Sequence, residues 1–194
     1  QPSYSISGIY KGSPITVTAT KRFGGAISSL TWSGKQFIDT ADHGRELQTA
    51  YSFNDLGECL NPTEAGSSSD SNGYTSSSIL ESASASGNVL NTQSKMAFWL
   101  SPGETTPFST TNCPNGRAVN TTRVSNDRLI KKVTIGVQGI PNAIEHDITI
   151  RIPEGDSYST VGIEALTAYL PPEFSKIYTY NPQNRTLTPI ASLG

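Results

Sequence analysis

Residues 23–32, with the sequence FGGAISSLTW, are the stretch that decides the fold. Their β-branched and aromatic residues predict a strand that begins at a glycine bend. The adjacent glycines Gly24 and Gly25 predict a β-bulge or a close approach of another backbone, because neither carries a Cβ atom. Residues 33–35 (SGK) predict a tight turn, and residues 36–38 (QFI) predict the returning strand. The stretch therefore predicts antiparallel β-structure.

Short strands separated by turns continue along the chain on both sides of this hairpin. The sequence has no convincing long amphipathic helical pattern, so we predict an all-β antiparallel sandwich that forms one domain over residues 1–194. Residues 66–73, rich in Ser, Gly and Asp, predict an exposed loop. The other strands are predicted at residues 4–10, 15–20, 47–53, 78–86, 88–93, 95–100, 128–137, 143–152, 159–169 and 174–180.

The composition excludes two classes of partner. Charged residues are 15% of the 194 residues, and the formal net charge is −2. This balance offers no basic footprint for nucleic acid. The chain has no run of about 18 apolar residues, which predicts that it does not span a membrane.

The cysteines and two sequons favour a secreted, extracellular protein. Cys59 and Cys113 are the only cysteines, and we expect a disulfide staple rather than a reactive or metal-bound pair. Asn120 and Asn184 each begin an N-glycosylation sequon. A chain that starts at Gln1 without an initiator Met is expected to be a mature form whose targeting segment has been removed.

The charged cluster at residues 42–48 (DHGRELQ) is the first candidate for chemistry. If it is a strand, alternation places His43 and Arg45 on one face, where the imidazole can transfer protons and the guanidinium can bind a carboxylate. Asp42, Gln48 and Glu58 are candidate substrate-binding residues. The alternative is an exposed turn of solvated charges, and in a loop the same-face argument fails.

Three further ionisable residues are candidates. Glu58 and Glu64 flank Cys59 in a segment that is expected to be stiffened by a disulfide and a proline. Each is either a carboxylate held in position for chemistry or a hydrogen-bond acceptor that stabilises the loop. His146 shares a predicted strand face with isoleucines, so it is either a core group or a second catalytic histidine. The histidines and carboxylates lack tight metal-ligand spacing, and no nucleophile elbow, phosphate loop or dinucleotide motif occurs, so we expect no metal and no cofactor.

Aromatic side chains are candidate sugar-stacking platforms, because apolar sugar faces pack on aromatic rings. Most of them are expected to belong to the core, with Tyr178 and Tyr180 as the preferred exposed pair on one strand face. The candidates are Trp32, Trp99, Tyr51, Tyr169, Tyr178 and Tyr180.

Residues 15–18 (ITVT), 23–32, 34–35 (GK) and 37–38 (FI) resemble the opening of the galactose-mutarotase-like supersandwich family, which includes sugar mutarotases and domains of polysaccharide lyases and glycoside hydrolases. Residues 42–48 and 61–66 (NPTEAG) resemble secreted microbial proteins of this broad type. The resemblance implies a supersandwich-like fold and activity on sugars. Arg45 matches the family's early arginine and His146 one of its histidines, whereas its late glutamate has no clear counterpart.

The family fold is longer than this chain. Either the fold here is smaller, or the chain is a piece of a longer precursor, an incomplete or cleaved half whose missing strands come from a companion chain.

Three hypotheses follow. The first is a carbohydrate-active enzyme of the mutarotase, lyase or hydrolase type, with His43, Arg45, Glu64 and His146 lining a groove for an oligo- or polysaccharide. In the second, the same groove with Tyr178 and Tyr180 binds glycan without turnover. In the third, the polar cluster only ties loops together.

Overall fold

The computed structural model describes residues 1–39, 44–70, 75–107 and 112–190, and these confirm an all-β protein built from antiparallel sheets. Sheet A has the order β1 (Ser3–Tyr10), β2 (Ser13–Thr20), β3 (Ile27–Trp32), β4 (Lys35–Gln36). Sheet B has the order β12 (Val161–Thr167), β5 (Gln48–Phe53), β6 (Pro62–Thr63), β9 (Ala97–Phe98). Sheet C has the order β11 (Ile140–Arg151), β10 (Arg128–Val137), β8 (Val89–Lys95), β7 (Ile79–Ser86).

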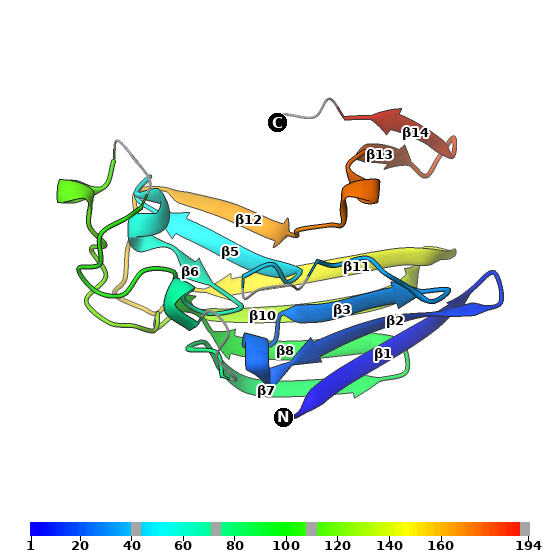
Figure 1. Cartoon of the computed structure of the whole chain (residues 1–194), viewed down its shortest axis with the longest axis horizontal. Coiled ribbons are helices and arrows are strands. Elements are labelled where there is room, and N and C mark those ends of the chain that lie inside the picture. The colour runs from blue at the N-terminus through cyan, green and yellow to red at the C-terminus, as the bar shows by residue number, and fades with distance from the viewer. Residues whose placement is uncertain (40–43, 71–74, 108–111, 191–194) are drawn as a thin grey trace.

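A hairpin and short 3-10 turns complete the described chain. The hairpin pairs β13 (Tyr178–Asn181) with β14 (Thr186–Pro189) and lies beyond the body of the sandwich (Figure 1). No helix in the described ranges has the length and apolarity needed to cross a membrane. The 3-10 turns are η1 (Lys21–Phe23), η2 (Gly57–Leu60), η3 (Ser68–Asp70), η4 (Pro114–Gly116) and η5 (Pro172–Phe174).

Sheet C forms one layer, and sheets A and B face it side by side (Figure 1). β1 crosses sheet C and contacts all four of its strands. Sheets A and B meet at a two-hydrogen-bond bridge between Ile27 and Leu47, with both N–H···O distances at 3.0 Å. The arrangement is a sandwich in which one layer is divided into two smaller sheets.

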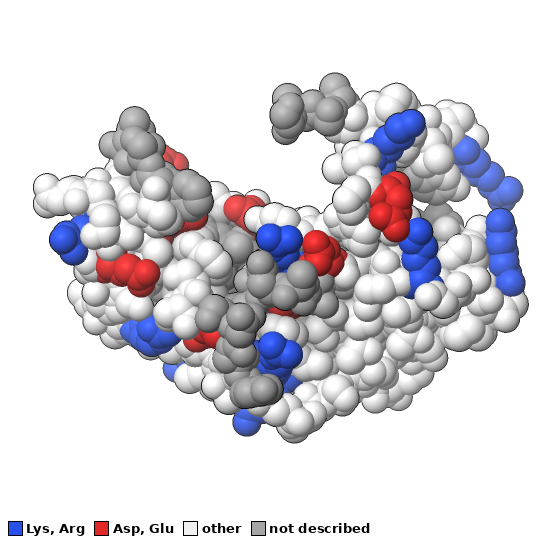
Figure 2. Space-filling view, viewed as in Figure 1, with Lys and Arg blue, Asp and Glu red and all other residues white. Residues whose placement is uncertain are grey.

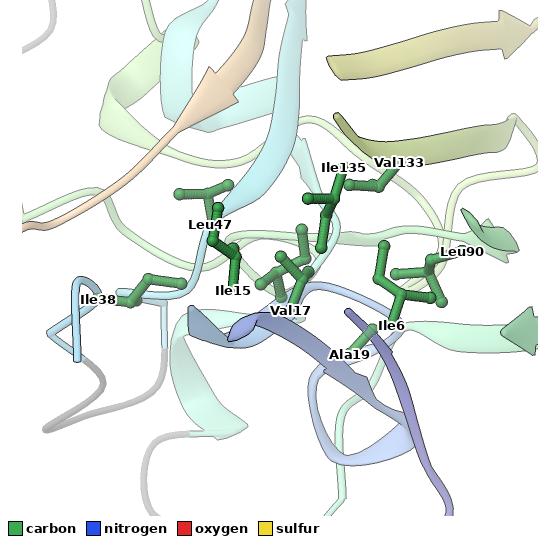
Figure 3. Packing of buried hydrophobic residues seen from close by; sticks show 10 residues of the cluster. Ile6, Ile15, Val17, Ala19, Ile38, Leu47, Leu90, Val133 and Ile135 are labelled. Carbon is green, nitrogen blue, oxygen red and sulfur yellow. The ribbon is translucent and has the colours of Figure 1, made fainter. Parts of the chain in front are cut away.

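Alternating side chains build the larger core between sheets A and C (Figure 3). In β10, Val133 and Ile135 are buried in this core, whereas Lys132 and Thr134, which alternate with them, are exposed and half-buried. This period of two is the pattern of a strand with one buried face. The cluster comprises Ile6, Ile15, Val17, Ala19, Ile27, Ile38, Leu47, Leu90, Val133 and Ile135.

A second core lies between sheets B and C. Tyr51, Phe53, Met96 and Leu129 are buried there. Tyr158 stacks on the ring of Phe53 with a centroid separation of 3.6 Å.

The disulfide between Cys59 and Cys113, predicted as a staple, is present and joins η2 to the start of η4.

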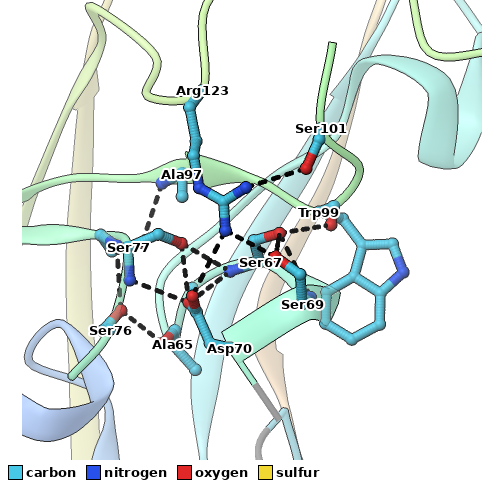
Figure 4. A network of polar contacts seen from close by, with 12 residues as sticks. Ala65, Ser67, Ser69, Asp70, Ser76, Ser77, Ala97, Trp99, Ser101 and Arg123 are labelled. Atoms are coloured by element: carbon cyan, nitrogen blue, oxygen red, sulfur yellow. Dashed lines mark hydrogen bonds and ion pairs between the residues drawn. The ribbon is translucent and has the colours of Figure 1, made fainter. Parts of the chain in front are cut away.

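The predicted exposed loop after residue 66 is wrong for Ser67, whose side chain is fully buried. Its polar groups are satisfied by neighbours: its N–H donates to Asp70 Oδ2 at 2.9 Å and its hydroxyl to the Trp99 carbonyl at 3.0 Å (Figure 4). Arg123 closes the network through Ser69 and Ser101. A polar sequence can be buried when hydrogen bonds inside the protein replace those to water.

Other differences concern element bounds. β5 begins at Gln48, so Arg45 lies in a connection rather than in a strand. In the predicted strand 95–100, Lys95 ends β8 and only Ala97 and Phe98 form a further strand, β9. The short strand β6 and the last strand β14 were not predicted, because a Pro–Thr pair and a polar C-terminal segment carry little strand signal.

The close backbone approach predicted at Gly24 and Gly25 is confirmed. A Cβ atom on Gly24 would lie 2.2 Å from the carbonyl oxygen of Glu64, and Gly24 has a φ of 62°. The pairing of β2 with β3 shifts register between Thr18 and Ala19, so the bulge lies at Ser28 rather than at the paired glycines. Sheet A can reach the end of β6 only because Gly24 lacks a side chain.

We predict that Gly24→Ala lowers the free energy of unfolding by about 2–4 kcal/mol, because the methyl group would collide with backbone and the φ is unfavourable for L-residues. Urea unfolding measures the loss. Gly34→Ala is the matched control, since Gly34 also has a positive φ (76°) but nothing lies within 4 Å of its Cβ position. Equal losses in the two variants would contradict the close-packing explanation.

Candidate functional site

The cluster at residues 42–48 is only partly described, since Asp42 and His43 lie outside the described residues. Arg45 Nη1 lies 3.4 Å from Asp39 Oδ2, and its guanidinium lies 5.6 Å from the ring centroid of Tyr169. The Asp39 N–H donates to the Tyr169 carbonyl at 2.8 Å. Arg45, Asp39 and Tyr169 therefore form one partly exposed surface group, which we call the Arg45 cluster.

Gln48 lies in the interior. Its Nε2 donates to the Gly44 carbonyl at 3.0 Å, and its Oε1 accepts from the Ala65 N–H at 2.9 Å. Its side chain is buried, with 5% of the residue exposed. These contacts hold two loops together, so the described role of Gln48 is structural.

Glu64 is also internal, where it forms an ion pair with Lys131 of β10. Its second carboxylate oxygen accepts from the Thr49 N–H at 3.1 Å, and Lys131 Nζ donates to the Gly25 carbonyl at 3.1 Å. Glu64 and Lys131 are 0% and 2% exposed. The pair links sheets A, B and C, and its burial separates Glu64 from bulk solvent.

Lys131 was not a candidate from the sequence, although a signal was present. It occupies the same alternating face of β10 as Leu129 and Val133, which are buried. A lysine at an inward strand position requires a partner, because an unpaired buried charge is costly. The sequence could flag the need for a carboxylate but could not identify Glu64.

His146 lies on the inner face of β11 between Ile144 and Ile148, the face predicted for it. Burial, and to a lesser degree the positive charge of Lys131, lowers the pKa of His146 from 6.5 to about 4. Its Nδ1 is buried and has no hydrogen-bond partner within the described ranges. The imidazole is therefore neutral at neutral pH and can accept a proton or a hydrogen bond.

The remaining carboxylate and tyrosine candidates lie apart from this centre. Glu58 is half-buried, accepts a hydrogen bond from Thr106 Oγ1 at 3.3 Å, and has a pKa raised by burial. Tyr178 and Tyr180 are each 45% exposed on the β13–β14 hairpin, as expected for the exposed pair.

The two sequon asparagines differ in environment. Asn120 is buried and its Nδ2 donates to the carbonyls of Leu100 (3.2 Å) and Thr122 (2.9 Å), whereas Asn184 is exposed. A glycan attached to Asn120 Nδ2 would replace these hydrogen bonds.

A cavity of about 290 Å³ opens at the end of the sandwich between sheet A and β11. Its wall contains the half-buried rings of Tyr10, Trp32 and Phe37, and Ile144 of β11 closes the opposite side. Trp32 Nε1 donates to the Tyr10 carbonyl at 3.1 Å, and their ring centroids lie 5.4 Å apart. The amide of Asn142 is exposed at this site. We call this the aromatic cavity.

The aromatic cavity and the Arg45 cluster are connected by one segment of chain. Phe37 lines the cavity and stacks on Phe174 at 4.7 Å, and two residues later Asp39 contacts Arg45 and Tyr169. Figure 2 shows the surface hollowed between the body of the sandwich and the projecting C-terminal hairpin, with charges of both signs nearby. The aromatic and charged groups thus border adjoining surface.

Trp32 was a stacking candidate from the sequence, but Tyr10, Phe37 and Asn142 were missed. Pairing supplies the missing information: Ile15 of β2 lies opposite Trp32 of β3, which turns the indole to the inner face at the end of the sheet. Such pairing between strands depends on register, which the sequence did not specify. Among the described residues, no group of three or more His, Cys, Asp and Glu is placed to hold a metal ion.

Comparison with known proteins finds no family model, no curated relative and no solved structure that matches this chain. The resemblance to the galactose-mutarotase-like family therefore stays a prediction.

We predict that Lys131→Met destabilises the fold by about 3–5 kcal/mol, because it leaves the Glu64 carboxylate buried without its cation. The double variant Glu64→Gln/Lys131→Met should recover much of this loss, since it removes both charges. Urea unfolding of both proteins measures the difference. A double variant no more stable than Lys131→Met would contradict the electrostatic explanation.

We predict that His146 makes stability depend on pH. The pKa of His146 is lower in the folded state than in the unfolded chain, so acid protonates the unfolded chain first. The stability that neutral His146 contributes is therefore fully present above pH 6.5 and is lost as the pH falls towards about 4. The urea midpoint of the wild type should therefore fall more steeply over this range than that of His146→Phe. Parallel midpoint curves would show that His146 contributes no such dependence.

Proposed function

We propose that this protein binds carbohydrate, with a sugar ring in the aromatic cavity and the adjoining residues of the glycan over the Arg45 cluster. The observation that carries the proposal is a cavity walled by three half-buried aromatic rings beside a partly exposed Arg–Asp pair. The likeness of residues 15–38 to a sugar-active family supports the same class of ligand.

The chemistry of the cavity suits a pyranose. The C–H face of a sugar packs on aromatic rings, and Tyr10, Trp32 and Phe37 offer such surfaces without being fully buried. The cavity volume of about 290 Å³ lies at the small end of ligand sites, so it accommodates a single ring rather than a chain. The exposed amide of Asn142 can bond hydroxyl groups.

The Arg45 cluster adds polar contacts for the rest of the glycan. Arg45 can donate a hydrogen bond to a sugar hydroxyl oxygen, and Asp39 can accept one from a hydroxyl group. The guanidinium can also pair with the carboxylate of a uronate sugar. Tyr169 is 55% exposed and supplies a further ring. Because both charged groups are partly solvated, the pair contributes little to stability.

His146 supports a second, catalytic version of the proposal. It is neutral at neutral pH and occupies the inner face of β11 two residues from Ile144, which lines the cavity. A neutral imidazole can accept a proton from a substrate, and its pKa of about 4 makes it a weak base for this step. His43, which the sequence favours for the same role, lies outside the described residues.

We predict that Trp32→Ala weakens glycan binding about tenfold or more, because it removes an aromatic platform. Calorimetric titration with neutral and uronate-containing oligosaccharides measures the affinity, and near-ultraviolet circular dichroism checks the fold. Tyr178→Ala is the control for an exposed aromatic residue outside the cavity. Loss of binding in Tyr178→Ala alone would move the site to the hairpin, and absence of binding by the wild type to the whole panel would contradict the proposal.

Turnover on the same panel separates binding from catalysis. Absorbance of unsaturated products reports elimination, new reducing ends report hydrolysis, and polarimetry of fresh sugar solutions reports mutarotation. Binding without any of these changes supports a binding module, whereas turnover that His146→Gln abolishes supports the catalytic version.

A further inference from the structure

The β13–β14 hairpin has one apolar face and one polar face. Tyr178 pairs with Pro189 and Tyr180 with Leu187, so these side chains share a face, whereas the alternate pairs consist of threonines and Asn181. All eight strand residues of the hairpin are exposed, with Leu187 at 63%. A strand pair with a single apolar face is stable when that face is covered, and an isolated hairpin is marginal in water.

The sandwich has an open edge between β12 and β11. Val161 and Ile163 of β12 pair with Phe53 and Tyr51, so they extend the same inner face. Phe53 and Tyr51 are fully buried, but Val161 and Ile163 are 39% and 56% exposed. In the facing layer, Ile148 and Ile150 of β11 are only half-buried. The second core is therefore uncovered along this side.

The total surface is larger than that of a compact monomer. The chain exposes 10793 Å², whereas a folded monomer of 20.7 kDa exposes roughly 8,900 Å². An interface that removed this excess of roughly 1,900 Å² from each of two copies would bury roughly 3,800 Å² in total. That area lies within the range of obligate homodimer interfaces. The apolar hairpin face and the open edge contribute to this excess.

We propose that two copies of this chain associate reciprocally, with the apolar face of each β13–β14 hairpin covering the open β11–β12 edge of the other copy. Each copy carries one hairpin and one open edge, so a twofold arrangement satisfies both. The partner's hairpin covers the exposed Ile163, and the partner's open edge covers the exposed Leu187.

Sedimentation equilibrium of the chain over a hundredfold concentration range tests the proposal. The expected mass is about twice 20.7 kDa for the wild type. Leu187→Asp on the hairpin and Ile163→Asp on the open edge should each raise the dissociation constant about 100-fold or more, because each substitution occurs twice in the interface. Thr188→Asp, on the polar hairpin face, and Ile9→Asp, at an isoleucine 65% exposed on β1, should leave it unchanged.

Mixing the two monomeric variants tests the pairing of hairpin with edge. A mixture of Leu187→Asp and Ile163→Asp retains one intact hairpin-to-edge contact per pair, so dimer should partly return. A mixture as monomeric as either variant alone overturns the reciprocal arrangement. A wild type that is monomeric throughout overturns the proposal and leaves the surface to a different polypeptide. Weakening by Ile9→Asp equal to that by Ile163→Asp also overturns it.

Discussion

The ion pair between Lys131 and Glu64 stands at the point where the three sheets meet. A lysine and a glutamate removed from water each incur a large desolvation cost, and only close pairing with further hydrogen bonds offsets it. Here those bonds come from the Thr49 N–H and the Gly25 carbonyl, which belong to sheet B and to the bend before β3. The pair therefore requires β10, β6 and the glycine bend to hold one mutual arrangement.

That constraint helps to hold together the two sheets of the divided layer. Sheets A and B lie side by side over sheet C, and the charged centre together with the Ile27–Leu47 bridge holds them together. The inner face of β11 crosses both cores, so Ile144 meets the aromatic cavity while His146 lies within the field of Lys131. Burial on this inner face, and to a lesser degree the charge of Lys131, keeps His146 unprotonated at neutral pH.

Much of the fold could be predicted, whereas less of the site could. The alternation of apolar and polar residues predicted the main strands, and the paired glycines predicted the close approach of Gly24 to the backbone of Glu64. The site depends on contacts between residues distant in sequence: Trp32 faces a cavity because of its register with Ile15, and Glu64 is buried because Lys131 reaches it. Local pattern carries no information on such pairing.

The sequence by itself determined the class of structure, because strand alternation and glycine bends are local features of the chain. It also determined the disulfide, because two cysteines allow only one pairing within the chain. Tertiary structure decided which polar groups are buried, which aromatic rings remain open and which strand edges stay uncovered. Glu64 and Arg45 illustrate the division: both are charged residues near turns, yet one is 0% exposed and the other is partly solvated. The physical reason is that burial of a charge depends on a partner elsewhere in the chain, and only the folded arrangement brings that partner near.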